Sequence, residues 1–223
     1  MCGRFVTVIP YEELKQIFDL IDSSTRTEPR YNVAPTQKIA VVWNTGEHNS
    51  LVPMKWGLIP SWSKDAAIAN HTINARCETV AEKPSFRHAI KYNRCIIPIS
   101  GFYEWSHTDG KKIPHYIHLS DRSPMSLAGI WEHWKNPEGQ EIKTFSILTT
   151  TSNSLIQPLH DRMPVILQPA DYDLWLSKNM HNPHELVHLY QPYSAEKMSL
   201  YEVSKLVNNP RFDSPSCLAP ADF

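Results

Sequence analysis

The sequence predicts a single α+β domain in which a mostly antiparallel sheet, strongly curved or barrel-like, is surrounded by short helices. Runs of β-branched and aromatic residues recur between tight turns, whereas helical periodicity is confined to short segments. Proline is frequent, with 18 residues, and glycine is scarce, with 7, which favours fixed loops and edge segments over long helices. No linker or low-complexity tract divides the 223 residues, so one domain over 1–223 is expected.

The first half of the chain is expected to contain one helix and a β-hairpin. The segment 10–20 has Pro10 in its first turn, acidic residues close behind it and apolar residues at helical spacing. Two β-rich runs on either side of the turn 44–46 predict strands. These strands are expected over 39–43 and 51–56, and loops are expected over 30–35 and 56–62.

The second half of the chain is predicted to consist mostly of strands that end in turns. Gly101 permits a bend between two of them, and Asp109 with Gly110 is typical of a hairpin turn, as is the segment 137–139. Strands are expected over 94–100, 102–105, 116–119, 125–134 and 144–150. Short helices are expected over 85–92, 171–177 and 183–190.

The composition argues against several classes of protein. The residues after Met1 do not resemble a signal peptide, and no stretch approaches the roughly 20 apolar residues of a membrane span. The four cysteines form no CxxC pair, which indicates free thiols in a reducing compartment. We therefore expect a cytoplasmic protein without a membrane partner, and we take it to be a monomer.

Charge is unevenly distributed along the chain. The net charge of −1 gives no argument for a nucleic-acid partner, but the segment 55–94 holds seven basic and three acidic residues. A basic groove and an ordinary solvated surface both fit this pattern. Trp62 and Phe86 lie in the same segment, where aromatic rings next to cations could stack on bases, whereas Trp56 is expected in the core.

The first residues, Met1, Cys2 and Gly3, are the most informative part of the sequence. Cys2 is small enough for Met1 to be removed, which would leave a free α-amine and a thiol on one residue. The α-amine titrates at about 7.7–8 and a thiol at about 8.5, so both are usable nucleophiles near neutral pH. Such an aminothiol condenses with an aldehyde to an imine, and the sulfur then closes a thiazolidine. An incidental cysteine behind a retained Met1 is the alternative.

Other segments carry side chains suited to proton transfer or phosphate binding. His160 is the residue type best suited to proton transfer near pH 7. Glu104 lies between two aromatic residues, so strand alternation gives it the opposite face, and a carboxylate held against aromatic rings suits a proton carrier. Asn74 can orient a carbonyl group, and Arg76 can bind a phosphate. A purely structural role is the alternative for each of these residues.

The segment 184–188 matches the pattern HExxH, in which two histidines on one helical face bind zinc. The expected helix is short, Pro192 follows it, and no convincing third ligand stands out. A zinc hydrolase that uses His184, Glu185 and His188 therefore stays an alternative, and neither a metal nor a cofactor is assigned.

Six short segments, taken together and in this order, resemble the SRAP family (SOS-response-associated peptidase). They are spread over most of the chain up to about residue 170, which makes their combination far more specific than any one of them. The last fifty or so residues match less distinctly, so no site residue is taken from them. The matching segments are 1–5, 30–35, 56–62, 73–79, 101–105 and 160–164.

The resemblance implies a DNA-damage protein that crosslinks covalently to abasic sites in single-stranded DNA and shields them, bound to the nucleoid when it is on DNA. It implies that the nucleophile is Cys2, that Asn74 positions it, and that protons are moved by Glu104 and His160. It further implies that DNA is contacted by Arg4, Asn32, Trp62, Arg76 and Arg162.

Two other classes of function stay open. A cysteine peptidase would use Cys2, His160 and Glu104 or Asn74 as its catalytic set, and removal of Met1 by the chain itself could be its only cleavage. A non-catalytic binder would hold single-stranded DNA through Trp62 and the segment 55–94, and its complex would be salt-sensitive and reversible. Strand cleavage through an imine is a further side activity that the chemistry allows.

Overall fold

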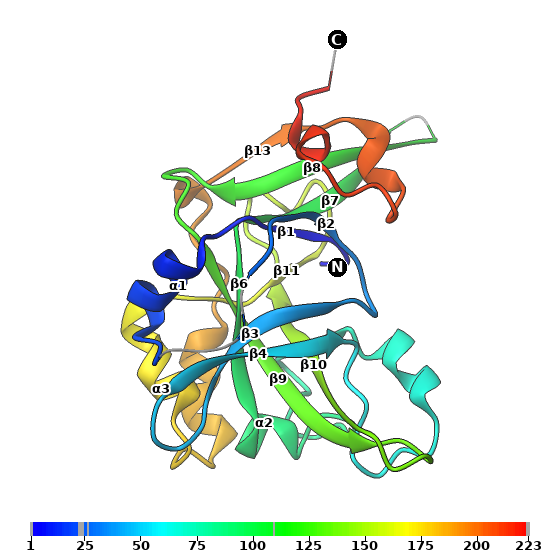
Figure 1. Ribbon diagram of the computed structural model, residues 1–223. Coiled ribbons are helices and arrows are strands. Elements are labelled where there is room, and N and C mark those ends of the chain that lie inside the picture. The colour runs from blue at the N-terminus through cyan, green and yellow to red at the C-terminus, as the bar shows by residue number, and fades with distance from the viewer. Residues whose placement is uncertain (1, 22–24, 26, 109, 222–223) are drawn as a thin grey trace.

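Five strands close into a barrel, which occupies the lower half of the view in Figure 1. Neighbouring strands are antiparallel except at one seam, where a parallel pairing of β10 with β4 closes the ring. In the order of their pairing, the strands are β4 (Asn49–Trp56), β3 (Lys38–Asn44), β6 (Arg94–Ile99), β9 (Met125–Lys135) and β10 (Glu141–Thr151).

A second sheet, antiparallel throughout, lies across one end of the barrel, at the top of Figure 1. Its strands in order are β13 (Met198–Glu202), β8 (Lys111–Leu119), β7 (Gly101–Thr108), β1 (Phe5–Thr7) and β2 (Arg30–Val33). Three short strands extend the barrel sheet: β5 (Asn74–Arg76) and β11 (Arg162–Pro164) pair with β10, and β12 (Ile166–Leu167) pairs with β9.

The computed structural model describes residues 2–21, 25, 27–108 and 110–221.

Side chains alternate between the two faces of the barrel wall. In β3, Ile39 and Val41 belong to the core inside the barrel, whereas Val42 belongs to the core that covers its outside. In β10, Phe145 points inward and Leu148 outward. The alternation seen in the sequence of these strands therefore produces two separate cores, with the barrel wall between them.

The amino terminus contributes to the inner core. Cys2 and Phe5 are fully buried with the inward side chains of the barrel. The ring of Phe5 lies 4.8 Å from that of Trp56, and Trp56 in turn stacks on Phe145 at 6.3 Å between ring centroids. The first residues of the chain therefore fill the end of the barrel that faces the second sheet, and Figure 1 shows the amino terminus between the two sheets.

Short helices cover the outer core. Helix α1 (Tyr11–Phe18) follows Pro10, carries acidic residues in its first turn and buries Leu14 and Phe18, and it ends where Asp19 adopts a left-handed conformation. The other elements on this face are α2 (Ala89–Tyr92), α3 (Tyr172–Leu176) and η3 (Pro183–Tyr190). The remaining 3₁₀ helices are η1 (Ala66–His71), η2 (Pro169–Asp171), η4 (Ala195–Lys197), η5 (Lys205–Asn208) and η6 (Pro215–Leu218).

The predicted fold class, a single α+β domain with a barrel-like, mostly antiparallel sheet and short helices, is confirmed.

The prediction of a loop over 30–35 is wrong for 30–33, because these residues pair with β1 as an edge strand. The predicted helix over 183–190 is a 3₁₀ helix that buries every third residue, namely Pro183, Leu186 and Leu189. Asp109, predicted in a hairpin turn, lies outside the described residues.

Among the described residues, none of the helices combines the length and the apolar character that crossing a bilayer requires.

The inner core should depend strongly on Trp56. This side chain is fully buried, and its indole N–H donates to the Ile73 carbonyl at 2.9 Å. We expect Trp56→Ala to lower the free energy of unfolding by about 3–5 kcal/mol in a denaturant titration, since it leaves a cavity in a closed barrel. The control is Trp62→Ala, because Trp62 is 60% exposed and its loss should change stability by no more than about 0.5 kcal/mol. Equal effects of the two variants would contradict the assignment of the core.

Candidate functional site

Cys2 is held from two sides at the junction of the barrel and the second sheet. From the barrel, the Asn74 side-chain amide donates to the Cys2 carbonyl at 2.9 Å. From the other side, the thiol packs among the buried side chains of the inner core, which include Phe5 and Phe102. The hydrogen bond and this packing hold Cys2 at the junction. Met1, whose removal is predicted, lies outside the described residues.

The electrostatic surroundings of Cys2 favour its neutral thiol. Burial raises the pKa of the Cys2 thiol well above its usual range, and the charge of Glu104 raises it further, whereas the positive charge of the amino terminus and the backbone N–H of Arg4 partly offset these effects. The sulfur is therefore protonated at neutral pH until a group accepts its proton.

Glu104 reaches this site through the alternation of β7. Its neighbours Tyr103 and Trp105 pack in a separate cluster with the carboxyl-terminal segment, whereas Phe102 belongs to the inner core with Cys2. Glu104 lies on the same face of β7 as Phe102 and is only 5% exposed. The register of β1 on β7, with Phe5 opposite Phe102, brings Glu104 next to the residues that precede β1.

His160 lies just before β11, between residues that enter the inner core. Ile156 and Met163, on either side of it in the chain, share that core with Cys2. The His160 Nδ1 atom is 2.9 Å from the backbone N of Arg162 and 2.7 Å from Asp161 Oδ1. A neutral ring can accept from Arg162, whereas a protonated ring can donate to Asp161 instead. Each protonation state of His160 thus has its own partner, and in the described chain the polar contacts of the ring are to these two residues.

Arg162 is buried and held rigidly. Its Nη1 and Nη2 atoms bind the two carboxylate oxygens of Glu78 at 2.5 and 2.8 Å, and Nη2 also donates to the Thr149 carbonyl at 2.6 Å. These hydrogen bonds lower the pKa of Glu78 and raise that of Arg162, so the pair is fully ionised at neutral pH. Arg162 is therefore held in a fixed position at the start of β11, and the Glu78 carboxylate balances its charge.

Arg4 and Asn32 connect the site with the carboxyl-terminal segment. Arg4 Nη1 donates to Asn32 Oδ1 at 2.7 Å and to the Val207 carbonyl at 2.8 Å. Asn32 is fully buried, and its amide also donates to the carbonyls of Val207, Asn209 and Phe212. In this conformation Asn32 is suited to holding Arg4 in place, and its predicted contact with DNA stays a prediction.

The two exposed residues of the predicted DNA surface lie on the barrel side of Cys2. Trp62 is 60% exposed on the loop before η1. Arg76, at the end of β5, is exposed and lines a hollow of about 350 Å³ together with Asn74, Lys83 and Phe86. Asn74, which binds the Cys2 carbonyl, also lines this hollow, so the hollow is adjacent to the site.

One part of the predicted basic groove is wrong. Arg94 is only 4% exposed, and its guanidinium binds main-chain carbonyls, including those of Trp175 and Ile90. It therefore fastens α2 and α3 to the barrel and does not face solvent. The hollow that Asn74 lines has two exposed basic residues from this segment, Arg76 and Lys83.

Sequence reasoning missed the contribution of the carboxyl-terminal segment. Val207 supplies a carbonyl to both Arg4 and Asn32, and Asp213 accepts from the backbone N–H groups of Tyr31 and Asn32. These partners act through main-chain atoms or through a lone carboxylate, so the sequence carries no motif for them.

The HExxH segment does not form a metal site. His184 and His188 are both exposed on a 3₁₀ helix, where residues four apart lie on different faces, and the Glu185 carboxylate accepts from Asn182 at 3.0 Å. No group of three or more metal-binding side chains occurs among the residues that the structure describes.

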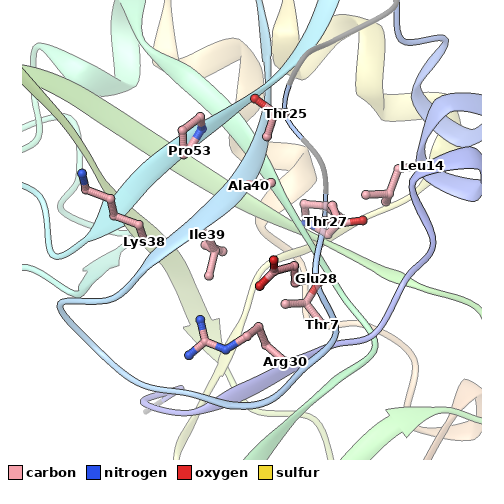
Figure 2. A pocket seen from close by; sticks show the side chains of 11 residues that line it. Thr7, Leu14, Thr25, Thr27, Glu28, Arg30, Lys38, Ile39, Ala40 and Pro53 are labelled. Atoms are coloured by element: carbon pink, nitrogen blue, oxygen red, sulfur yellow. The ribbon is translucent and has the colours of Figure 1, made fainter. Parts of the chain in front are cut away.

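A second hollow lies on the outer side of the barrel wall and carries none of the predicted site residues. Its volume is about 220 Å³. Figure 2 shows Glu28, Arg30 and Lys38 among the residues that line it. The Arg30 guanidinium is bound to Asp213 and to Gln37. Cys2, Asn74 and Glu104 are not among the residues that line this hollow.

Comparisons with known proteins place the sequence and its fold. A family model described as SOS response associated peptidase (SRAP) matches residues 1–210. The chain is 43% identical over 221 residues to the abasic site processing protein YoqW of Bacillus subtilis (strain 168), covering 98% of this chain and 99% of that protein. It is 28% identical over 273 residues to the abasic site processing protein HMCES of Rattus norvegicus, covering 100% of this chain and 77% of that protein. A crystal structure of a protein from Bacteroides thetaiotaomicron has a TM-score of 0.89 at 29% identity, covering 99% of this chain and 100% of that one.

The charge of Glu104 should be measurable at the Cys2 sulfur. We expect Glu104→Gln to lower the pKa of the Cys2 thiol, because the variant removes a negative charge that disfavours the thiolate. Alkylation of Cys2, followed by mass spectrometry from neutral to alkaline pH, should reach half of its maximal rate at a lower pH in the variant. Cys77 in the same molecules serves as the control, since its pKa is set by burial and by Thr150, Glu78 and Arg162. A midpoint that does not move would show that Glu104 does not act on the sulfur.

Proposed function

Because the chain belongs to the SOS response associated peptidase (SRAP) family, we propose that it is an abasic site processing protein that traps the lesion covalently. The relatives YoqW and HMCES, each called an abasic site processing protein, support the substrate. The proposed product is a thiazolidine between Cys2 and the open-chain aldehyde of an abasic site in single-stranded DNA. Its place of action would be the cytoplasm, on the nucleoid.

The observation that carries this proposal is the setting of Cys2. Residues close to a chain terminus are usually exposed, whereas Cys2 is fully buried in the inner core, and its carbonyl accepts from the Asn74 amide. Burying the first residues in this way constrains the chain end that would otherwise be mobile. The constraint is useful where the α-amine and the thiol must meet one carbon atom together.

The chemistry requires Met1 to be removed first. The Cys2 amine then adds to the aldehyde carbon, and the resulting carbinolamine loses water to give an imine. The sulfur adds to the same carbon while its proton moves to the nitrogen, which closes the ring without an oxidant or a reductant. Glu104 and His160 would carry the protons that the loss of water and the ring closure require. The same carriers could open the ring again, so the adduct is expected to be slowly reversible.

DNA would be held by the cations around Cys2. Arg162 is fixed by Glu78 and Arg4 by Asn32, so each can meet a phosphate at low entropic cost. Arg76 would bind a phosphate in the adjacent hollow, and the exposed ring of Trp62 would pack against a base.

A cysteine peptidase fits these surroundings less well. Such an enzyme needs a thiolate that a histidine has activated. Burial and Glu104 raise the pKa of the Cys2 thiol, and the described contacts of the His160 ring are to Asp161 and Arg162. We keep cleavage of Met1 by the chain itself as a proposed maturation step, and cleavage of DNA through the imine as a proposed side reaction.

The covalent step can be tested directly with a single-stranded oligonucleotide that carries one abasic site. We expect the chain, with loss of Met1 verified, to give a shifted band that survives denaturation. Cys2→Ala and Cys2→Ser should both lose this band and should give more strand cleavage, because an imine that no thiol closes can eliminate the 3′ phosphate. A chain with a blocked amino terminus should give neither product. Absence of the band when the amine is free would overturn the proposal.

The roles of Glu104 and His160 can be separated from DNA binding. We expect Glu104→Gln and His160→Gln to slow crosslink formation by about 10²- to 10⁴-fold, the usual contribution of a proton carrier, with little change in affinity for DNA. Rapid-quench gels give the rate, and anisotropy of a labelled oligonucleotide gives the affinity. Glu138→Gln, in the exposed turn between β9 and β10, serves as the control. An unchanged rate would remove the residue concerned from the mechanism.

A further inference from the structure

Trp105 and two cations form a platform at the edge of the second sheet. The Arg4 guanidinium lies 5.9 Å from the centroid of the Trp105 indole, and the Lys112 ammonium lies 5.4 Å from it. The indole N–H donates to Asn208 Oδ1 at 2.7 Å, which fixes the orientation of the ring. Trp105 is half-buried and Lys112 is exposed, so the edge of this platform is open to solvent.

The positive charge of this platform is not neutralised within the described part of the chain. Arg4 donates to the neutral oxygens of Asn32 and Val207, and neither Arg4 nor Lys112 lies within 4 Å of a described carboxylate. Glu104 is the closest carboxylate to Trp105 in the sequence, but it points to the opposite face of β7. The contacts of the platform therefore leave its charge available to an anion.

The platform and the hollow around Arg76 flank Cys2 on different sheets. Asn74, at the start of the hollow, binds the Cys2 carbonyl from the barrel, whereas the Arg4 carbonyl accepts from Tyr103 of the second sheet. In Figure 1 the amino terminus lies between these two sheets. Cys2 is therefore connected to the hollow through Asn74 and, two residues along the chain, to the platform through Arg4.

We propose that Trp105, Arg4 and Lys112 bind the nucleotides on one side of the abasic site, while Arg76 and Lys83 bind those on the other side. This inference rests on the proposed function, and it adds that the 5′ flank and the 3′ flank of the abasic site bind to different surfaces. The occupant is the flank of the same single-stranded DNA, because an anchored indole offers a stacking face for a base and the two cations offer contacts for its phosphates. Lys112 is outside every segment that resembles the family, so sequence reasoning gave it no role.

Three oligonucleotides test this inference: one with nucleotides on both sides of the abasic site, one with only the 5′ flank and one with only the 3′ flank. Reversible binding is measured by anisotropy in a Cys2→Ala background, so the result does not depend on crosslinking. We expect Lys112→Ala to weaken binding roughly threefold to tenfold for the two-flank oligonucleotide and for one single-flank oligonucleotide only. We expect Lys83→Ala to weaken binding of the other one. Each variant should lower by about one the number of counterions that are released when the two-flank oligonucleotide binds, as measured from the salt dependence of the affinity.

The matched control is Lys135→Ala, because Lys135 is exposed at the far end of β9. This substitution should change the affinity for none of the three oligonucleotides. The inference is overturned if Lys112→Ala behaves like this control, or if it weakens both single-flank oligonucleotides equally. Failure of the proposed function is a separate result, because it appears as the absence of a crosslink in the chain that retains Cys2.

Discussion

Strand β10 is the element on which the rest of the structure depends, because it pairs with four other strands. Its parallel pairing with β4 closes the barrel, and its antiparallel pairing with β9 continues the wall. It also holds two strands of three residues each, β5 and β11, that would not be stable alone. Through β5 it places Asn74 against Cys2, and through β11 it places Arg162 next to Glu78. One strand therefore sets both the shape of the fold and half of the site.

The other half of the site comes from the second sheet, so Cys2 lies where two sheets meet. β7 supplies Glu104 on its inner face and Trp105 on its outer face, and Arg4 directly precedes β1. Neither sheet alone contains all of the groups that we propose for proton transfer and phosphate binding. This division explains why a residue so close to the end of the chain is fully buried, since the packing of one sheet on the other encloses it.

The parts of this structure that depend on local pattern could be predicted from the sequence, and the parts that depend on distant main-chain contacts could not. The hairpin of β3 and β4 follows from alternation, and the placement of Glu104 on its own face of β7 follows from its aromatic neighbours. Asn32 was expected at the DNA surface, yet the carbonyls it binds come from residues 207, 209 and 212, which no local pattern connects with it. The strands β5 and β11 are too short to show a period. Over the eight residues 183–190, the apolar pattern does not distinguish a 3₁₀ helix from an α-helix.

The contact between the two ends of the chain has a consequence for synthesis. Arg4 is held by the Val207 carbonyl and by Asn32, and Asn32 is itself held by carbonyls as late in the chain as that of Phe212. A ribosome adds Arg4 and Asn32 long before it reaches Val207 and Phe212. The surroundings of Cys2 therefore stay incomplete in a nascent chain until the segment up to Phe212 has left the ribosome.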